Sequence, residues 1–195
     1  MCGIAGLIHR GKSSNVGSEL QGMLQALKHR GEDSTGYALY GDTDGKNFIM
    51  RFKVGENVGE GSSSVMEDVS VVHNGQLTNY WNNRRVLENK GMRFMSECDS
   101  ELIAVYLAEK MRDGATLEEG MKESLTGLDG VFTYFVATKD SLGMAKDTMA
   151  AKPLVLYESD DLVAMGSEEI AIRSVLPQEI DTYDPFDGEV KVWQI

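Results

Sequence analysis

Apolar residues follow the helical repeat in several stretches of the chain. Within residues 18–27 they fall at positions i, i+3, i+4 and i+7, which predicts an amphipathic helix with its apolar face toward the core. The same spacing follows Asp99, and Thr116 stands where it could cap another helix. We therefore expect helices over residues 18–27, 82–91, 99–107, 116–128 and 168–175.

Short apolar runs rich in β-branched and aromatic residues predict strands between and around these helices. Alternating apolar residues over 48–54 predict a further strand with Arg51 on its solvent face. The strands expected are 4–8, 37–40, 48–54, 69–72, 131–137, 142–146, 154–157, 162–165 and 189–193. Strands at both ends of the chain, with helices between them, suggest an α+β fold of two packed sheets with helices outside.

The length of 195 residues suits one domain, which we place over residues 1–195. A hydrophobic share of 42% with 26% charged residues is typical of a soluble globular protein. The net charge of −12 argues against nucleic acid or an anionic membrane as the main partner, because both attract basic surfaces. The sequence shows neither an apolar run of about 20 residues nor a signal-peptide pattern, so we expect a cytoplasmic protein.

The cysteines and histidines do not form a metal-binding pattern. Cys2 and Cys98 belong to no C-x-x-C spacing, and the histidines are scattered along the chain. We therefore predict that no metal is bound. A structural disulfide between the two cysteines is not expected in a reducing compartment.

The first seven residues, MCGIAGL, place a cysteine directly after the initiator methionine. Removal of Met1 would leave Cys2 with a thiol and a free α-amine, which are a nucleophile and a base of similar ordinary pKa. The thiol proton would reach the amine through a bridging water. Cysteine is also among the residues most often buried, so core filling at the start of a strand is the alternative.

Two polar motifs at the ends of predicted elements could serve amide hydrolysis. Asn74 and Gly75 follow the strand over 69–72, so the Asn74 side-chain amide and the Gly75 backbone N–H could converge on an oxyanion. The alternative is a hairpin turn, for which Asn-Gly is the strongest short signal. Asp99 begins a helical pattern, where its alternative role is an N-cap.

Taken in order, the motifs resemble those of the class II glutamine amidotransferases. The resemblance lies in CGIAG from residue 2, HRGEDSTG from 29, VVHNGQLTN from 71 and CDSE from 98, followed by AKD, KPL and AMGSE from 145, 152 and 164. Ordered motifs over most of a chain are far more specific than any one of them. The resemblance implies an N-terminal nucleophile hydrolase domain, built as a four-layer α-β-β-α sandwich, that releases ammonia from glutamine.

The resemblance also implies the roles of the catalytic residues. Cys2 would attack the side-chain carbonyl of glutamine and form a thioester, which water then hydrolyses to glutamate. Asn74 and Gly75 would stabilise the tetrahedral oxyanion.

Substrate binding is implied for Arg30, His73 and Asp99. The Asp99 carboxylate would hold the α-ammonium of glutamine, and Arg30 would brace the loop beside the nucleophile. The family segment Gly-His-x-Arg, whose arginine binds the α-carboxylate, is absent from this chain. Arg51 or Lys53 could replace it. The absence keeps open the alternative of a regulatory or docking subunit with impaired catalysis. An amidase for another amide is a third possibility, favoured if the pocket is apolar where Asp99 should face it.

Ammonia is useful only where an acceptor lies nearby. The stretch from His73 onward is most similar to the separate amidotransferase subunits of glutamate synthase-type enzymes, so we expect a synthase partner in addition to glutamine. The resemblance implies no cofactor on this chain, with flavin and iron–sulfur clusters as options on partner subunits. A homo-oligomer is also open.

Overall fold

The computed structural model describes residues 2–11, 15–31, 35–40, 52–54 and 69–194. Most elements within these ranges lie within a few residues of their predicted positions. The elements are β1 (Ala5–His9), α1 (Val16–Ala26), the 3-10 helix η1 (Lys28–Arg30), β2 (Thr35–Tyr37), β3 (Phe52–Val54), β4 (Ser70–Leu77), α2 (Tyr80–Asn89), α3 (Asp99–Arg112), α4 (Leu117–Gly127), β5 (Gly130–Ala137), β6 (Ser141–Lys146), β7 (Val155–Glu158), β8 (Leu162–Gly166), α5 (Glu169–Arg173) and β9 (Val190–Gln194).

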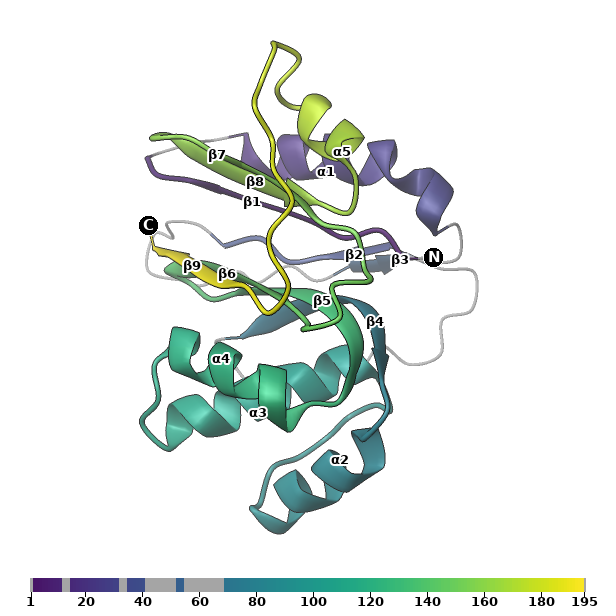
Figure 1. Ribbon diagram of the computed structural model, residues 1–195, viewed down its shortest axis with the longest axis vertical. Coiled ribbons are helices and arrows are strands. Elements are labelled where there is room, and N and C mark those ends of the chain that lie inside the picture. The colour runs from purple at the N-terminus through teal and green to yellow at the C-terminus, as the bar shows by residue number, and fades with distance from the viewer. Residues whose placement is uncertain (1, 12–14, 32–34, 41–51, 55–68, 195) are drawn as a thin grey trace.

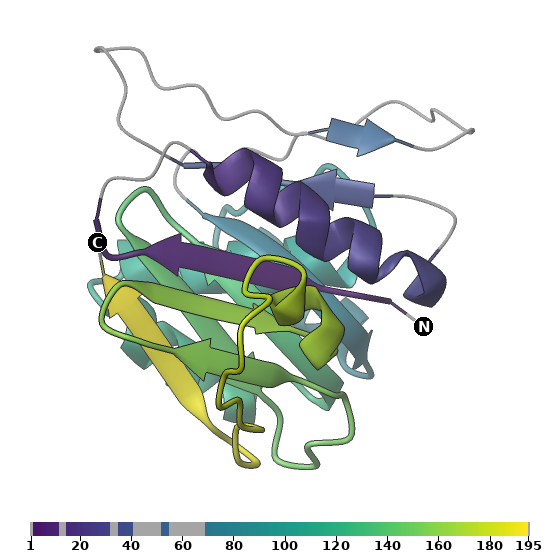
Figure 2. The same cartoon turned by 90° about the horizontal axis from the view of Figure 1, so that it is seen from above.

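Two antiparallel sheets pack face to face and carry helices on their outer sides (Figures 1 and 2). One sheet has the strand order β1-β8-β7 and the other β4-β5-β6-β9, while β2 and β3 form a separate pair. Figure 1 shows α1 and α5 outside the first sheet and α2, α3 and α4 outside the second. The predicted four-layer α-β-β-α sandwich is therefore confirmed.

Alternation of side chains along the strands divides the core into three apolar layers. Along β5, Phe132 and Tyr134 pack beneath the helices, whereas Phe135 points between the two sheets. The layer between the sheets also contains Ile4, just before β1. The third layer joins Met23 of α1 to β8. The start of β1 is thus held between two buried layers.

Strand β4 extends beyond its predicted end at residue 72. It continues to Leu77 in unbroken register with β5, and Asn74 lies opposite Thr133. The hairpin alternative for Asn74 and Gly75 is wrong, because both residues lie inside a paired strand. The apolar pattern is interrupted at His73, but backbone pairing does not depend on the polarity of side chains.

The ends of the helices test the predicted caps. Cys98 occupies the N-cap of α3 and Asp99 is its first residue, so the N-cap alternative for Asp99 is wrong. Thr116 does cap α4, because its side chain accepts a hydrogen bond from Glu119 N at 3.2 Å in a reciprocal capping box. Gly91 follows α2 with a φ of +85°, a conformation in which glycine commonly ends helices. Among the described residues, no helix has the length and apolar character needed to cross a membrane.

The segment between η1 and β4 is described only in part. Strand β2 begins earlier than the predicted strand over 37–40, and its Thr35 lies opposite Val54 of β3. Strand β3 lies within the predicted strand over 48–54. Arg51 is outside the described residues, so its expected place on a solvent face stays a prediction.

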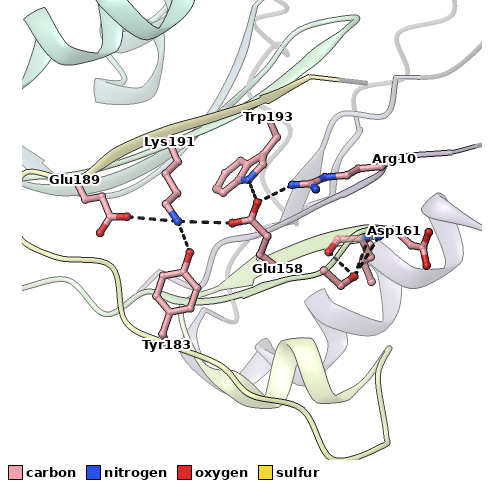
Figure 3. Close-up of polar contacts among 9 residues, drawn as sticks. Arg10, Glu158, Asp161, Tyr183, Glu189, Lys191 and Trp193 are labelled. Carbon is pink, nitrogen blue, oxygen red and sulfur yellow. Dashed lines mark hydrogen bonds and ion pairs between the residues drawn. The ribbon is translucent and has the colours of Figure 1, made fainter.

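A polar cluster joins the edges of the two sheets (Figure 3). The Glu158 carboxylate of β7 accepts hydrogen bonds from Arg10 Nη2 at 2.6 Å and from Trp193 Nε1 at 2.8 Å. Lys191 Nζ lies 3.6 Å from the same carboxylate and donates to Tyr183 Oη at 2.5 Å. These five residues, called the Glu158 cluster below, link β7 of one sheet to β9 of the other.

Candidate active site

The residues before β1 are fixed against β8 and the end of α1. Ile4 N donates to Ser167 Oγ at 3.0 Å, and Ser167 N donates to Ile4 O at 2.9 Å. A Cβ atom on Gly3 would lie 3.1 Å from Leu27 Cβ, so glycine allows this backbone to pack closely on the helix. The side chain of Cys2 is exposed, and the core-filling alternative is therefore wrong.

The Arg30 side chain holds the backbone of Cys2. Arg30 is only 8% exposed, and its Nε donates to Cys2 O at 3.2 Å while Nη1 donates to Glu168 Oε1 at 2.5 Å. Glu168 also contacts His29 Nε2 at 3.0 Å. The hydrogen bond from Arg30 is the main cause that lowers the pKa of Glu168, so the carboxylate is ionised at neutral pH. Arg30 thus connects the expected nucleophile to the start of α5.

The expected oxyanion pair lies inside β4. Asn74 is 3% exposed, and its buried Nδ2 atom has no hydrogen-bond partner among the residues that the structure describes. Buried amide groups nearly always have a partner, so this donor is available to a bound molecule. Gly75 has a φ of +146°, and a Cβ atom there would lie 2.1 Å from Val131 O. A residue with a side chain could not occupy this position without moving β5.

Strand register brings the starts of β1 and β7 to one end of the sandwich. Gly166 of β8 pairs with Ala5 on one side and with Val155 on the other. Because both pairings are antiparallel, β1 and β7 run in the same direction. Cys2 precedes Ala5 by the same number of residues as Lys152 precedes Val155. Both residues therefore lie at the same end of the sandwich.

Asn74 belongs to that end as well. Thr133, its partner across the strands, donates from Oγ1 to Lys152 O at 3.4 Å. Thr133 shares a face of β5 with Phe135, so both Thr133 and Asn74 face the space between the sheets. Figures 1 and 2 agree in showing the start of β1 on the same side of the molecule as the end of β4.

Asp99 contacts the end of β4 instead of capping its own helix. Its Oδ2 atom accepts a hydrogen bond from Leu77 N at 3.0 Å. The Oδ1 atom has no hydrogen-bond partner in the part of the chain that the structure describes. One carboxylate oxygen is therefore anchored and the other is free for a cationic group.

His73 points to the opposite face of β4 from Asn74. It pairs with Tyr134, which packs beneath the helices, and its buried Nε2 atom has no hydrogen-bond partner within the described ranges. Burial lowers the pKa of His73, while Asp99 opposes this effect and Lys152 adds to it. The imidazole is therefore neutral at neutral pH. The charges of Asp99 and Lys152 therefore act on His73, which lies on the face of β4 opposite to Asn74.

Sequence reasoning missed the residues that hold the site in place. Ser167 and Glu168 belong to a recognised motif, but they bind Ile4 and Arg30, which are 163 and 138 positions away. The link from Thr133 to Lys152 was also missed, because Thr133 lies within β5 and Lys152 precedes β7, and no local pattern connects the two residues. Within the described ranges, no group of three or more His, Cys, Asp or Glu side chains could hold a metal ion.

Comparison with known families identifies the class of protein that has this fold. The family model described as glutamine amidotransferase domain matches residues 1–184. The chain therefore belongs to the class II glutamine amidotransferase domains, which are a family of enzymes.

Two curated relatives illustrate the range of similarity. A protein of Methanothermobacter thermautotrophicus with a provisional glutamine amidotransferase name is 27% identical over 307 residues, covering 100% of both chains. The glutamine amidotransferase-like protein GlxB of Rhizobium meliloti is 40% identical over 132 residues, covering 67% of this chain and 44% of its own. This chain thus spans the whole of one relative and less than half of the other.

Solved structures share the fold. The glutamine phosphoribosylpyrophosphate amidotransferase from B. subtilis, complexed with ADP and GMP, superposes with a TM-score of 0.77 at 22% identity. A structure described as the allosteric regulatory enzyme of purine biosynthesis gives 0.79 at 21% identity. Each match covers 99% of this chain and 47% of the solved chain. At these identities the likeness shows the fold alone, and the roles of individual residues stay predictions.

Proposed function

We propose that this chain hydrolyses the side-chain amide of glutamine through a thioester on Cys2, giving glutamate and ammonia. The observation that carries the proposal is the buried Asn74 amide without a partner, beside Gly75 and at the end of the sandwich where Arg30 holds the Cys2 backbone. An unsatisfied buried donor costs about 1–3 kcal/mol. A substrate oxygen placed between the sheets would remove that cost, and membership of the family supports glutamine as the substrate.

The proposed reaction begins after Met1 has been removed. The α-amine of Cys2 accepts the thiol proton through a water molecule, and the sulfur attacks the carbonyl carbon of the glutamine side chain. Asn74 Nδ2 and the Gly75 N–H stabilise the negative charge on the carbonyl oxygen. The protonated amine then gives its proton to the departing ammonia, and the thioester remains on sulfur. Water attacks this thioester through the same oxyanion and releases glutamate.

The surrounding residues orient the reactants in this proposal. Asp99 binds the α-ammonium of glutamine through Oδ1, because its Oδ2 is already anchored by Leu77 N. Arg30 holds the carbonyl of Cys2 and so limits rotation of the residue that bears the thiol. His73 contributes a neutral ring behind β4, on the face away from the reacting atoms.

We also propose that the ammonia passes to a synthase partner of the glutamate synthase type. Other relatives are named amidophosphoribosyltransferase and glutamine–fructose-6-phosphate aminotransferase, names that describe transfer to an acceptor. Glutamate and free ammonia would be measured with and without a candidate synthase subunit. Coupling should lower free ammonia relative to glutamate, whereas equal amounts in both samples would argue against that partner.

The proposed hydrolysis is tested first at the N-terminus. Intact mass and N-terminal sequencing of the native protein should show that Cys2 is the first residue. Cys2→Ala should then lower kcat/KM for glutamine by at least about 10³-fold, since the nucleophile is absent. Cys98→Ala is the matched control, because Cys98 is also exposed and its side chain makes no helix-capping hydrogen bond.

Two results would overturn this function. Met1 retained in a protein that still cleaves glutamine would exclude the free α-amine as the base, and equal turnover by Cys2→Ala would exclude the thiol. A processed protein that never cleaves glutamine, alone or with a synthase subunit, would favour the docking subunit. The absence of the Gly-His-x-Arg segment is the observation that keeps this second candidate in view.

A further inference from the structure

Glutamine carries two opposite charges that a binding site must match. In the proposed function the Asp99 carboxylate binds the α-ammonium, so a cation is needed for the α-carboxylate. The contacts described above place Arg30, Lys146 and Lys152 at or near the active-site end of the sandwich. The question is which of these cations is free to bind a ligand.

Two of the three cations already have partners. Arg30 donates to Cys2 O and to Glu168. Lys146 is 6% exposed, and its Nζ donates to Pro185 O at 3.1 Å. Lys152 is partly buried, and its ammonium has neither a carboxylate nor a hydrogen-bond partner among the residues that the structure describes.

The backbone that carries Lys152 is held in one conformation. Asp147 is 3% exposed, and its carboxylate accepts hydrogen bonds from Phe132 N at 2.7 Å, Met149 N at 2.6 Å and Ala150 N at 3.0 Å. Ala150 adopts a φ of +50°, an uncommon conformation for a residue with a side chain. The carbonyl of Lys152 then accepts the Thr133 hydroxyl. Such local fixation is typical of loops that present a side chain to a ligand.

The Lys152 backbone lies near the strand pair that contains Asn74, and the charges of Lys152 and Asp99 both act on His73. The pKa of His73 responds to both charges in opposite senses, which places Lys152 and Asp99 within electrostatic range of one imidazole. Thr133 bonds to Lys152 O and pairs with Asn74, so the same residue also lies near the expected oxyanion donor. Lys152 and Asp99 therefore offer opposite charges at the candidate site, one for each charge of an amino acid.

We propose that the Lys152 ammonium binds the α-carboxylate of the substrate, while Asp99 binds its α-ammonium. This inference rests on the proposed function and assigns a substrate-binding residue for it. Binding of both charged groups selects a free α-amino acid, because a glutamine residue within a peptide would lack one or both of these charges. It also supplies the cation that this chain needs without the Gly-His-x-Arg segment.

The test compares glutamine with 4-aminobutanamide, which is glutamine without its α-carboxylate. Lys152→Met should raise KM for glutamine by about 10- to 100-fold, because a charge-assisted hydrogen bond is lost from substrate binding. Its kcat should stay within about two-fold of the wild type, since the reacting atoms are untouched. Turnover of 4-aminobutanamide should be unchanged by the substitution, and Lys152→Arg should restore most of the affinity for glutamine.

Lys139→Met is the matched control, because it removes the same charge from an exposed turn after β5, at the other end of that strand. Thermal unfolding establishes that each variant is folded, and Lys152→Gln replaces the methionine variant if that variant does not fold. An unchanged KM for glutamine in the Lys152 variants would overturn the proposal. An equal loss with both substrates would also overturn it, because Lys152 would then act only by shaping the loop.

Failure of the proposed function can be distinguished from failure of this inference. If the wild type does not cleave glutamine, binding of L-glutamine is measured by calorimetry on Cys2→Ala and on the same variant with Lys152→Met added. Binding that weakens about 10- to 100-fold supports the role of Lys152 in the absence of catalysis. Binding that is absent or unchanged overturns it.

Discussion

Two polar regions of the molecule use their hydrogen-bonding groups in opposite ways. In the Glu158 cluster, the carboxylate of Glu158 meets Arg10, Trp193 and Lys191, so that donors and acceptor satisfy one another (Figure 3). At the active-site end, Asn74 Nδ2 is buried without a partner. The first region joins two sheets, and the second leaves a buried donor without a partner in the part of the chain that the structure describes.

Under the proposed function, the difference separates polar groups that serve folding from polar groups that serve catalysis. Folding favours satisfied buried groups, and departures from this rule are expected at functional sites. The active-site end contains several departures, including the free Asn74 amide, the buried His73 Nε2 and the positive φ of Ala150. Substitutions in the two regions should therefore separate activity from stability.

The largest expected effect comes from Asn74→Ala. Loss of one oxyanion donor should lower kcat by about 10²–10³-fold. The free energy of unfolding should not fall, because Asn74 Nδ2 has no hydrogen-bond partner among the described residues that the substitution would remove. Steady-state glutaminase assays and urea unfolding measure the two quantities on the same sample.

Asn79→Ala is the control for this variant, because it removes an asparagine side chain that is hydrogen-bonded. The Asn79 side chain donates to Gly127 O at 3.1 Å and accepts from Asp129 N at 3.0 Å. Its loss should cost about 1–3 kcal/mol of stability and leave the kcat of the folded protein unchanged. If Asn74→Ala were the less stable variant, or Asn79→Ala the less active one, the contrast between polar groups with and without partners would be wrong.

A smaller effect is expected from Glu158→Ala in the Glu158 cluster. The Trp193 indole N–H would lose its acceptor, Arg10 its carboxylate partner and Lys191 one of two, which should lower the free energy of unfolding by about 1–2 kcal/mol. Part of the loss should disappear in high salt, since the ion pairs are partly exposed and screened. Urea unfolding at two salt concentrations measures both effects, with kcat expected to stay at the wild-type value.

Glu158→Gln provides the comparison within the cluster. Its amide oxygen can still accept from Trp193, but it carries no charge for Arg10 and Lys191. The variant should therefore lose less stability than Glu158→Ala and show little dependence on salt. A fall in kcat without a loss of stability would instead place Glu158 in the catalytic machinery.

The fold was largely predictable because its elements carry strong local patterns. The apolar face of α1 and the β-branched run of β5 repeat at helical and strand periods, and Thr116 is a recognisable cap. Strand β4 was predicted too short, because pairing with β5 continues through polar residues. The pairing of β1 with β8 could not be predicted from the local sequence, because β8 lies more than a hundred residues later.

The candidate site residues were predictable only where a short sequence motif contains the nucleophile or the expected oxyanion donors. Cys2, Asn74 and Gly75 belong to short motifs, and the structure places the motifs that contain them at one end of the sandwich. Glu168 and Lys152 were missed as site residues, because their importance depends on contacts across the fold. No periodicity or spacing encodes which side chain will lack a partner after folding.

The smallest expected effect is a pH dependence of stability that arises from His73. Because burial lowers the pKa of His73 in the folded protein, the unfolded chain binds the proton more tightly. Stability from this residue is therefore complete above the ordinary histidine pKa of about 6.5 and falls as the pH drops below it.

Urea unfolding at pH 7.5, 6.5 and 5.5 (about one unit on either side of that value) measures how steeply stability changes with pH. His73→Gln should reduce the slope, and Lys152→Met should reduce it less, because Lys152 contributes only part of the lowering. A slope that is unchanged in His73→Gln would mean that this buried imidazole does not limit the acid stability of the active-site end.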